Sequence, residues 1–229
     1  MKTAVRVGLA LAIGAAARAA EGQKLDVRFI GNMAFAVTDG KTTLYTDFPY
    51  QSGAFGYMTY DASAVPAARE CVCLVTHGHL DHFDPSLFAR MGCALIAPPS
   101  LVKKIGTNRA VAFAPEMAYR VIEIEAFRTP HGDIEHYSYL VTWHGRRLYF
   151  TGDTESTDQL LAVRDLDVAF VSPWLIEAVA KKNSRIDARR IVAYHHHTDE
   201  KVADLQDRKV PTQGETFFLE GVSAGAAPR

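Results

Sequence analysis

The stretch Thr76-His77-Gly78-His79-Leu80-Asp81-His82 follows an apolar run, Cys71 to Thr76, that predicts a buried strand. It places four side chains that can bind a metal within six residues. Imidazole nitrogen and carboxylate oxygen are ligands that zinc prefers, and the end of a strand with its following turn can direct all four toward one point. A single histidine is more often a core or surface residue, but few structural roles need this density of donors. The stretch therefore predicts a metal centre at the end of a strand.

The same stretch resembles the signature of the metallo-β-lactamase superfamily, whose histidine-x-histidine-x-aspartate-histidine motif stands here at 77–82. The resemblance implies further ligands, each placed after a strand. His131 stands in Thr129-Pro130-His131-Gly132, Asp153 stands in Thr151-Gly152-Asp153-Thr154, and His195 follows the apolar run Ile191 to Tyr194. These motifs occur in the family's order and extend over most of the chain beyond the first twenty residues.

The resemblance also implies how the metals are shared. One divalent ion is expected on His77, His79 and His131, and a second on Asp81, His82 and His195, with Asp153 bridging the two. Zn²⁺ is the expected metal, with Mn²⁺ and Fe²⁺ as alternatives. Because such cations lower the pKa of bound water, the family implies a hydrolase in which a metal-bridging hydroxide attacks an electrophilic carbonyl or phosphorus. Asp81 is the expected catalytic residue, orienting the hydroxide and later carrying a proton.

Several other side chains near these motifs leave alternatives open. His196 or His197 would replace His195 if the last strand ended later, although the motif register favours His195. His136 and His144 are not expected to be ligands. Asp47, at the end of a predicted strand, either orients a ligand histidine or only begins a turn.

An aromatic-rich loop at 48–60 also has two interpretations. It contains five aromatic residues among glycine, serine and glutamine: Phe48, Tyr50, Phe55, Tyr57 and Tyr60. These side chains either form a lip over the metals or pack in the core.

The resemblance narrows the function to hydrolysis of an ester-type bond in a small molecule. An acidic residue at position 153 argues against a true β-lactamase, which carries cysteine or serine at the corresponding motif. The length and the Thr46-Asp47-Phe48-Pro49 stretch are similar to the branch of L-ascorbate-6-phosphate lactonase and N-acylphosphatidylethanolamine-hydrolysing phospholipase. One alternative is a flavodiiron-type redox protein, which typically has an acidic residue where His79 stands. Another is a non-catalytic metal-binding protein, which would require the loss of a ligand, and no ligand is missing.

The resemblance implies the fold class α+β, a four-layer αββα sandwich with the metals at one edge between two sheets. Apolar patterns predict an opening meander of strands at 25–30, 34–38 and 42–47, with Asp39-Gly40 as a hairpin turn. Later strands are expected at 71–76, 94–97, near 111, at 119–124, 126–129, 137–143, 147–150, 168–171 and 191–194. Helices are expected at 85–91, capped by Asp84, at 101–105, at 157–163 and in part of 174–190.

The domain organisation follows from length and from the chain ends. With 229 residues and 48% hydrophobic side chains, we expect one domain at 20–222 and a frayed C-terminal tail at 223–229. Residues 1–19 resemble a secretory signal peptide, because basic residues precede the apolar run Val7 to Ala17 and a small-x-small site. We therefore expect an exported chain, periplasmic or secreted. The run is about half of the roughly 20 residues that span a bilayer, so no stable membrane anchor is expected.

Charge and cysteine content limit the partners and the cross-links. Lys plus Arg total 25 against 26 for Asp plus Glu, so nothing indicates nucleic-acid binding, and we expect a small-molecule substrate. Three cysteines permit at most one internal disulfide. Cys71 and Cys73 stand on one face of a strand at about 6.6 Å between Cα atoms, which disfavours a bond between them. We expect Cys71 and Cys73 to be buried structural thiols rather than redox or metal-binding groups.

Overall fold

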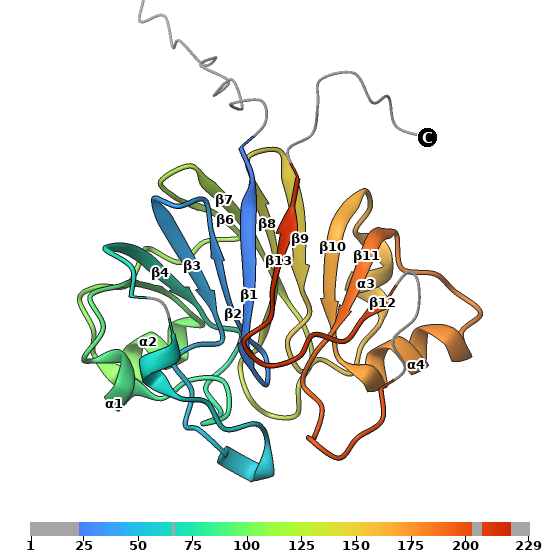
Figure 1. The fold of residues 1–229 in the computed structure, drawn as a ribbon, viewed down its shortest axis with the longest axis horizontal. Helices are drawn as coiled ribbons and strands as arrows, with labels where there is room; N and C mark the ends of the chain where they lie inside the picture. Colours follow the sequence, from blue (N-terminus) through green and yellow to red (C-terminus); the bar gives the residue numbers. More distant parts are fainter. Residues whose placement is uncertain (1–22, 66, 203–207, 221–229) are drawn as a thin grey trace, which may run out of the picture.

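The computed structural model describes residues 23–65, 67–202 and 208–220 of the chain. Its strands form two sheets that pack face to face (Figure 1). The first sheet has the order β13-β1-β2-β3-β4-β5 and the second β12-β11-β10-β9-β8-β7-β6. The strands of the first sheet are β1 (Leu25–Gly31), β2 (Ala34–Thr38), β3 (Thr42–Thr46), β4 (Glu70–Leu74), β5 (Ala94–Ile96) and β13 (Thr216–Leu219). Those of the second are β6 (Glu116–Tyr119), β7 (Ile122–Arg128), β8 (Tyr137–Trp143), β9 (Arg146–Phe150), β10 (Leu166–Val171), β11 (Ala188–Ala193) and β12 (Arg208–Lys209).

The helices are short. They are α1 (Pro85–Phe88), α2 (Pro99–Ile105), α3 (Asp158–Ala162) and α4 (Pro173–Lys181), with 3-10 turns η1 (Ala54–Gly56) and η2 (Ala62–Ala64). The predicted cap of α1 is confirmed, because the Asp84 side chain accepts hydrogen bonds from the backbone N–H groups of Ser86 and Leu87. Within the described residues, no helix has both the length and the apolar character needed to cross a membrane.

Three apolar clusters define the layers. The largest lies between the sheets and includes Phe35 and Leu74 from the first sheet and Phe150 from the second. A second cluster, with Phe88 of α1, covers the outer face of the first sheet. A third, with Leu175 of α4, covers the outer face of the second. The layers therefore run helix, sheet, sheet, helix, which confirms the predicted αββα sandwich.

Two hairpins form where turn chemistry predicts them. In the β2–β3 hairpin, the Asp39 carboxylate accepts hydrogen bonds from the N–H groups of Lys41 and Thr42, each at 2.9 Å. The β8–β9 hairpin turns at His144 and Gly145, which both have positive φ. Several neighbouring strands are parallel: β3 pairs with β4, and β10 pairs with β9 and β11. Parallel pairing brings the carboxyl ends of neighbouring strands to one edge of each sheet.

Some predicted boundaries are wrong. The strand expected at 119–124 crosses a turn, because Arg120 has a φ of 60° and separates β6 from β7. Near residue 111 there is only an isolated bridge between Leu95 and Ala110. The helix predicted in part of 174–190 is confirmed as α4, whereas the strand predicted at 191–194 begins earlier, because β11 runs from Ala188 to Ala193. The predicted signal peptide at 1–19 and the tail at 223–229 lie outside the described residues.

The expectation of two buried thiols is confirmed for Cys73 and wrong for Cys71. Cys71 and Cys93 form a disulfide, while Cys73 is a buried free thiol. The bond joins the segments where the neighbouring parallel strands β4 and β5 begin, and their pairing brings the two Cα atoms to 4.7 Å. Sequence spacing excluded a bond from Cys71 to Cys73 but could not show that β5 pairs with β4.

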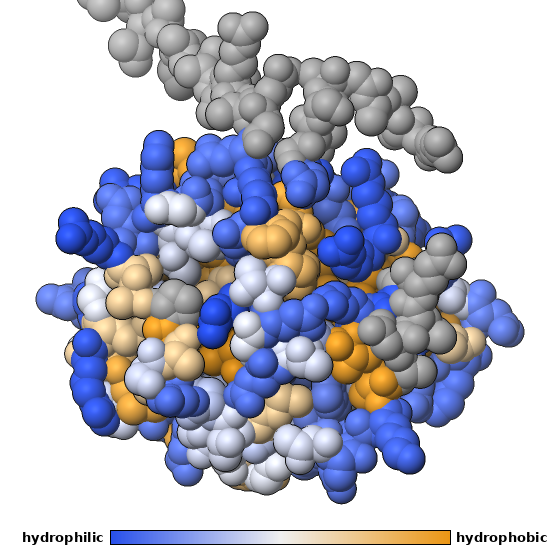
Figure 2. Space-filling model, viewed as in Figure 1, coloured by the Kyte–Doolittle hydropathy of each residue, from blue (hydrophilic) through white to orange (hydrophobic). Residues whose placement is uncertain are grey.

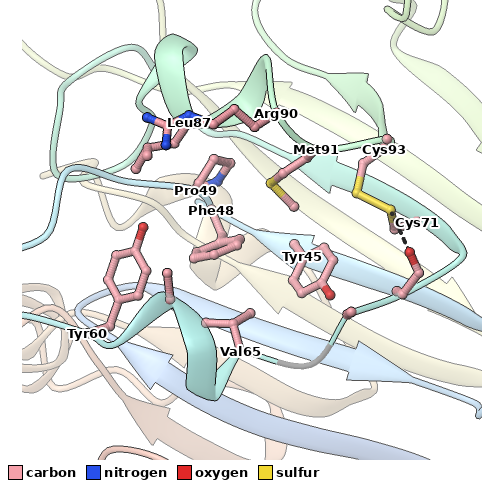
Figure 3. A pocket seen from close by; sticks show the side chains of 14 residues that line it. Tyr45, Phe48, Pro49, Tyr60, Val65, Cys71, Leu87, Arg90, Met91 and Cys93 are labelled. Carbon is pink, nitrogen blue, oxygen red and sulfur yellow. Dashed lines mark hydrogen bonds between the residues drawn. A yellow bond between two sulfur atoms is a disulfide. The ribbon is translucent and has the colours of Figure 1, made fainter.

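A groove lies beside this disulfide. It has a volume of about 360 Å³ and is lined by Tyr45, Phe48 and Met91 among others, with the disulfide at one end (Figure 3). Hydrophilic residues cover most of the face of the molecule seen in Figure 2, and apolar residues form separate patches between them.

Candidate metal centre

The sequence-predicted site residues come from loops at the ends of strands. His77, His79, Asp81 and His82 follow β4, and His131 lies in the loop between β7 and β8. Asp153 follows β9 and His195 follows β11, strands that lie on either side of β10. All seven side chains that the sequence singled out meet at one edge of the sandwich.

The potential ligands form two groups. Within each group, one potential ligand atom of every residue lies within 4.8 Å of those of the others: His77, His79 and His131 in the first group, and Asp81, His82, Asp153 and His195 in the second. In the first group, His77 Nε2 is 2.9 Å from His79 Nδ1, which is 3.5 Å from His131 Nε2.

Asp153 lies between the two groups. Its Oδ2 atom is 3.0 Å from His195 Nε2 and 3.2 Å from His82 Nε2 within its own group. The same oxygen is 3.9 Å from His77 Nε2 and 4.0 Å from His131 Nε2 in the first group. This position is the one that a bridging carboxylate would occupy.

The donor set fits divalent metal ions. Buried polar atoms are rarely left without a hydrogen-bond partner, yet His195 Nδ1 and Asp153 Oδ1 have none. Five imidazoles and two carboxylates converge here, and bound cations would satisfy their unpaired nitrogen and oxygen atoms. Nitrogen and oxygen ligands of this kind suit zinc and related transition metals.

Electrostatics in the second group favour a carboxylate beside imidazolium. Burial alone would raise the pKa of Asp153, but the charges of His82 and His195 hold that pKa well below its usual range. Burial likewise disfavours charge on His82, and the carboxylates of Asp153 and Asp47 outweigh it and raise the pKa of His82. Asp153 and His82 therefore favour each other's charged forms.

Asp47 contacts a candidate ligand. Its carboxylate accepts hydrogen bonds from the Thr76 N–H at 2.8 Å and the Thr76 hydroxyl at 3.0 Å, and Oδ2 lies 3.4 Å from His82 Nδ1. Asp47 adopts a left-handed conformation with a φ of 42°, which aspartate adopts more readily than most residues. Of the two interpretations, the structure favours the one in which Asp47 orients His82.

His136 is buried in the hydrogen-bond network around Asp153 and is in neither ligand group. Its Nδ1 lies 2.8 Å from the Thr129 hydroxyl, and its Nε2 accepts a hydrogen bond from the Asp153 N–H at 3.0 Å. Burial lowers the pKa of His136 to about 3, so the ring is neutral. Gly152 packs against it, since a Cβ atom at that position would lie 2.3 Å from His136 Nε2.

The remaining histidines have other contacts. His196 is buried, and its Nδ1 donates to the His197 carbonyl at 3.1 Å. His197 is exposed and its ring stacks on Tyr57. His144 lies in the β8–β9 turn and pairs with Asp39 of the β2–β3 turn at 2.9 Å. Only His195 of the three consecutive histidines belongs to a ligand group.

The aromatic loop divides between the two interpretations. Phe48 and Tyr50 are buried in the cluster outside the first sheet, and Tyr60 packs against it. Phe55, by contrast, is 67% exposed, and its ring centroid is 6.3 Å from that of His79. The Tyr57 ring lies 4.2 Å from the His195 ring. Two of the five aromatic residues therefore border the ligand groups, one beside each group.

The groove beside the disulfide is separate from the metal centre, because none of the seven candidate ligands lines it. Sequence reasoning also missed Asn32, which is completely buried and contacts the backbone of two candidate ligands. A single asparagine after Gly31 gives no signal of that contact beyond its tolerance of a left-handed turn.

Comparisons with known proteins agree with this geometry. A family model described as a beta-lactamase superfamily domain matches residues 66–212, more than half of the chain. A metal-dependent hydrolase of Deinococcus radiodurans is 27% identical over 163 residues, which are 64% of this chain and 71% of that protein.

Solved structures share the fold. A metallo hydrolase of the archaeon Ignicoccus hospitalis has a TM-score of 0.64 at 15% identity, covering 86% of this chain and 99% of that one. A diiron β-hydroxylase of Streptomyces venezuelae has a TM-score of 0.53 at 15% identity, covering 75% of this chain and 44% of that one. At such identities the likeness shows the fold alone. From the match over residues 66–212 and the His/Asp cluster at the edge of the sandwich, the chain belongs to the metallo-β-lactamase superfamily, among its metal-dependent hydrolases.

Proposed function

We propose that the chain is a binuclear metal-dependent hydrolase that cleaves an ester-type bond, such as a phosphodiester or lactone, in a small molecule. The position of Asp153 between the two ligand groups carries this proposal, because one carboxylate oxygen lies within 4.0 Å of four imidazoles from both groups. His77, His79 and His131 would hold one ion, and Asp81, His82 and His195 the other. Two Zn²⁺ ions are proposed because imidazole nitrogen predominates among the donors.

Divalent ions at this site would supply a nucleophile from water near neutral pH and stabilise negative charge on the substrate. The chain supplies orientation. Asp81 is buried, and its Oδ2 atom lies 3.6 Å from both His82 Nε2 and His195 Nε2. At that position the carboxylate can accept a proton from the attacking water and return it to the leaving group.

The exposure of the two groups indicates where the substrate enters. The second group is buried, whereas His79 is exposed and His131 is partly exposed. Phe55 and Leu80, at 67% and 43% exposure, lie next to this open side. Exposed apolar side chains beside a polar centre often bind ligands, so we propose a substrate with an apolar portion next to the hydrolysed bond.

An exported location is part of the proposal. The Cys71–Cys93 disulfide supports it, because disulfides persist in oxidising compartments and are rare in the cytosol. Expression of the full-length chain in a Gram-negative bacterium, followed by fractionation and N-terminal sequencing, tests it. A cytosolic chain that retains Met1 would contradict export.

Hydrolysis assays test the function. The chain is treated with chelator, reconstituted with Zn²⁺, and assayed on aryl phosphodiester, lactone, thioester and β-lactam substrates. We expect turnover of an ester-type substrate that disappears on chelation. Asp81→Asn should reduce kcat by at least 100-fold, while Glu177→Gln, an exposed residue of α4, serves as the matched control. Turnover that persists without metal, or that Asp81→Asn leaves unchanged, would refute the proposal.

A further inference from the structure

Asn32 occupies an unusual position between the ends of β1 and β2. The residue is completely buried and adopts a left-handed conformation with a φ of 53°. Asparagine tolerates this conformation better than most residues. A buried polar side chain needs hydrogen-bond partners, so its partners show what the residue does.

Two of its three hydrogen-bond partners are candidate ligands of the same group, and the third is Met58 Sδ, which accepts a hydrogen bond from the Asn32 N–H at 3.4 Å. Asn32 Nδ2 donates a hydrogen bond to the main-chain oxygen of Asp81 at 2.9 Å. The main-chain oxygen of Asn32 accepts a hydrogen bond from the N–H of His195 at 3.0 Å. One residue thus joins the loop after β4 to the end of β11, two segments that lie more than one hundred residues apart in the chain.

We propose that Asn32 is a positioning residue that assembles the second ligand group by holding the main chains of Asp81 and His195. The inference rests on the proposed metal-binding function but concerns a residue outside the ligand set. Asp81 Oδ2 and His195 Nε2 are 3.6 Å apart, and the two hydrogen bonds to Asn32 fix the backbones from which these side chains extend.

The same contact explains the choice among three consecutive histidines. The N–H of His195 donates a hydrogen bond to the main-chain oxygen of Asn32. His195 lies two residues after the end of β11 and has a left-handed φ of 55°. With residue 195 fixed, His195 faces Asp153 at 3.0 Å, whereas the His196 ring bonds the His197 carbonyl. Asn32 therefore determines which of the three histidines after β11 faces the second ligand group.

The test measures metal affinity without any substrate. Asn32→Gly keeps the left-handed backbone, and with it the His195 contact, but removes the bond to Asp81. Asn183→Gly is the matched control, because Asn183 is exposed, has a φ of 50° and lies in the turn after α4. Zn²⁺ affinities come from chelator competition, and Co²⁺ absorption spectra distinguish the two sites.

We expect Asn32→Gly to bind the ion of the first ligand group like the wild type. It should bind the ion of the second ligand group about 10- to 100-fold more weakly, the range typical of groups that orient metal ligands. Asn183→Gly should bind both ions normally. If Asn32→Gly does not fold, Asn32→Asp keeps the side-chain volume. Its added negative charge favours cations, so weaker binding of the second ion would come from the lost donor.

Two normal affinities in both Asn32 variants would overturn the inference while leaving the proposed function intact. An equal loss of affinity for both ions would also overturn it, because that result indicates a general loss of stability. A wild-type chain that binds fewer than two ions would instead contradict the proposed function, and the inference with it.

Discussion

Gly152 has a left-handed backbone and packs closely against His136, beside the candidate ligand Asp153. Gly152→Ala should therefore destabilise the fold and disturb the metal centre together. Gly152 has a φ of +61°, and an added Cβ would lie 2.3 Å from His136 Nε2 and 3.0 Å from Thr76 Cβ. The left-handed conformation costs an alanine about 1 kcal/mol, overpacking costs about 1–3 kcal/mol, and displacing the His136 bond to the Asp153 N–H costs about 1 kcal/mol. We expect the free energy of unfolding to fall by about 3–5 kcal/mol.

Gly106→Ala separates the backbone cost from the packing cost. Gly106 has a φ of +63°, nearly that of Gly152, but an added Cβ meets nothing within 4 Å. Urea unfolding of the metal-free variants should therefore show a loss of about 1 kcal/mol for Gly106→Ala and a further loss of about 2–4 kcal/mol for Gly152→Ala. If the two variants differ by less than about 1 kcal/mol, the close packing of Gly152 on His136 is refuted.

Three further predictions concern titration, the disulfide and the carboxylate beside His82. Burial holds the pKa of His136 at about 3, below the unfolded value near 6.5, so the neutral ring contributes stability above pH 6.5 that is lost as pH falls toward 3. Between these pH values, the free energy of unfolding of the metal-free wild type should therefore rise with pH. In His136→Gln it should rise less steeply, by about 1.4 kcal/mol per pH unit, as urea unfolding measures it. Parallel slopes would contradict the assignment. Replacing both Cys71 and Cys93 by alanine should lower the free energy of unfolding by about 3 kcal/mol, and dithiothreitol should destabilise the wild type but not this variant. Asp47→Asn should lower the affinity for one Zn²⁺ ion about 10- to 100-fold in chelator competition. Unchanged affinity would show that Asp47 only forms the turn.

The resemblance of the motifs to a known family predicted the sandwich and the residues that meet at its edge, and local patterns predicted the strands that carry them. The dense motif at 77–82 and the apolar runs before it and before His195 are short-range features, and the structure brings their side chains together. The β2–β3 turn was also predictable, because Asp39 bonds to residues only two and three positions later.

The features that escaped prediction depend on long-range pairing. The buried position of Asn32 was missed because its hydrogen bonds join it to Asp81 and His195, which lie far later in the chain. The disulfide depends on the parallel pairing of β4 with β5, which no spacing of cysteines shows. The turn at Arg120 was missed because its left-handed residue is neither glycine nor asparagine.

The central claim is that the two ligand groups hold two metal ions. Plasma mass spectrometry of the purified chain, alongside His79→Ala and His82→Ala, tests it most directly, because each variant removes a ligand from a different group. We expect about two zinc ions per wild-type chain and about one in each variant. A wild-type chain that binds one ion or none after reconstitution, or variants that retain the full wild-type content, would contradict the claim.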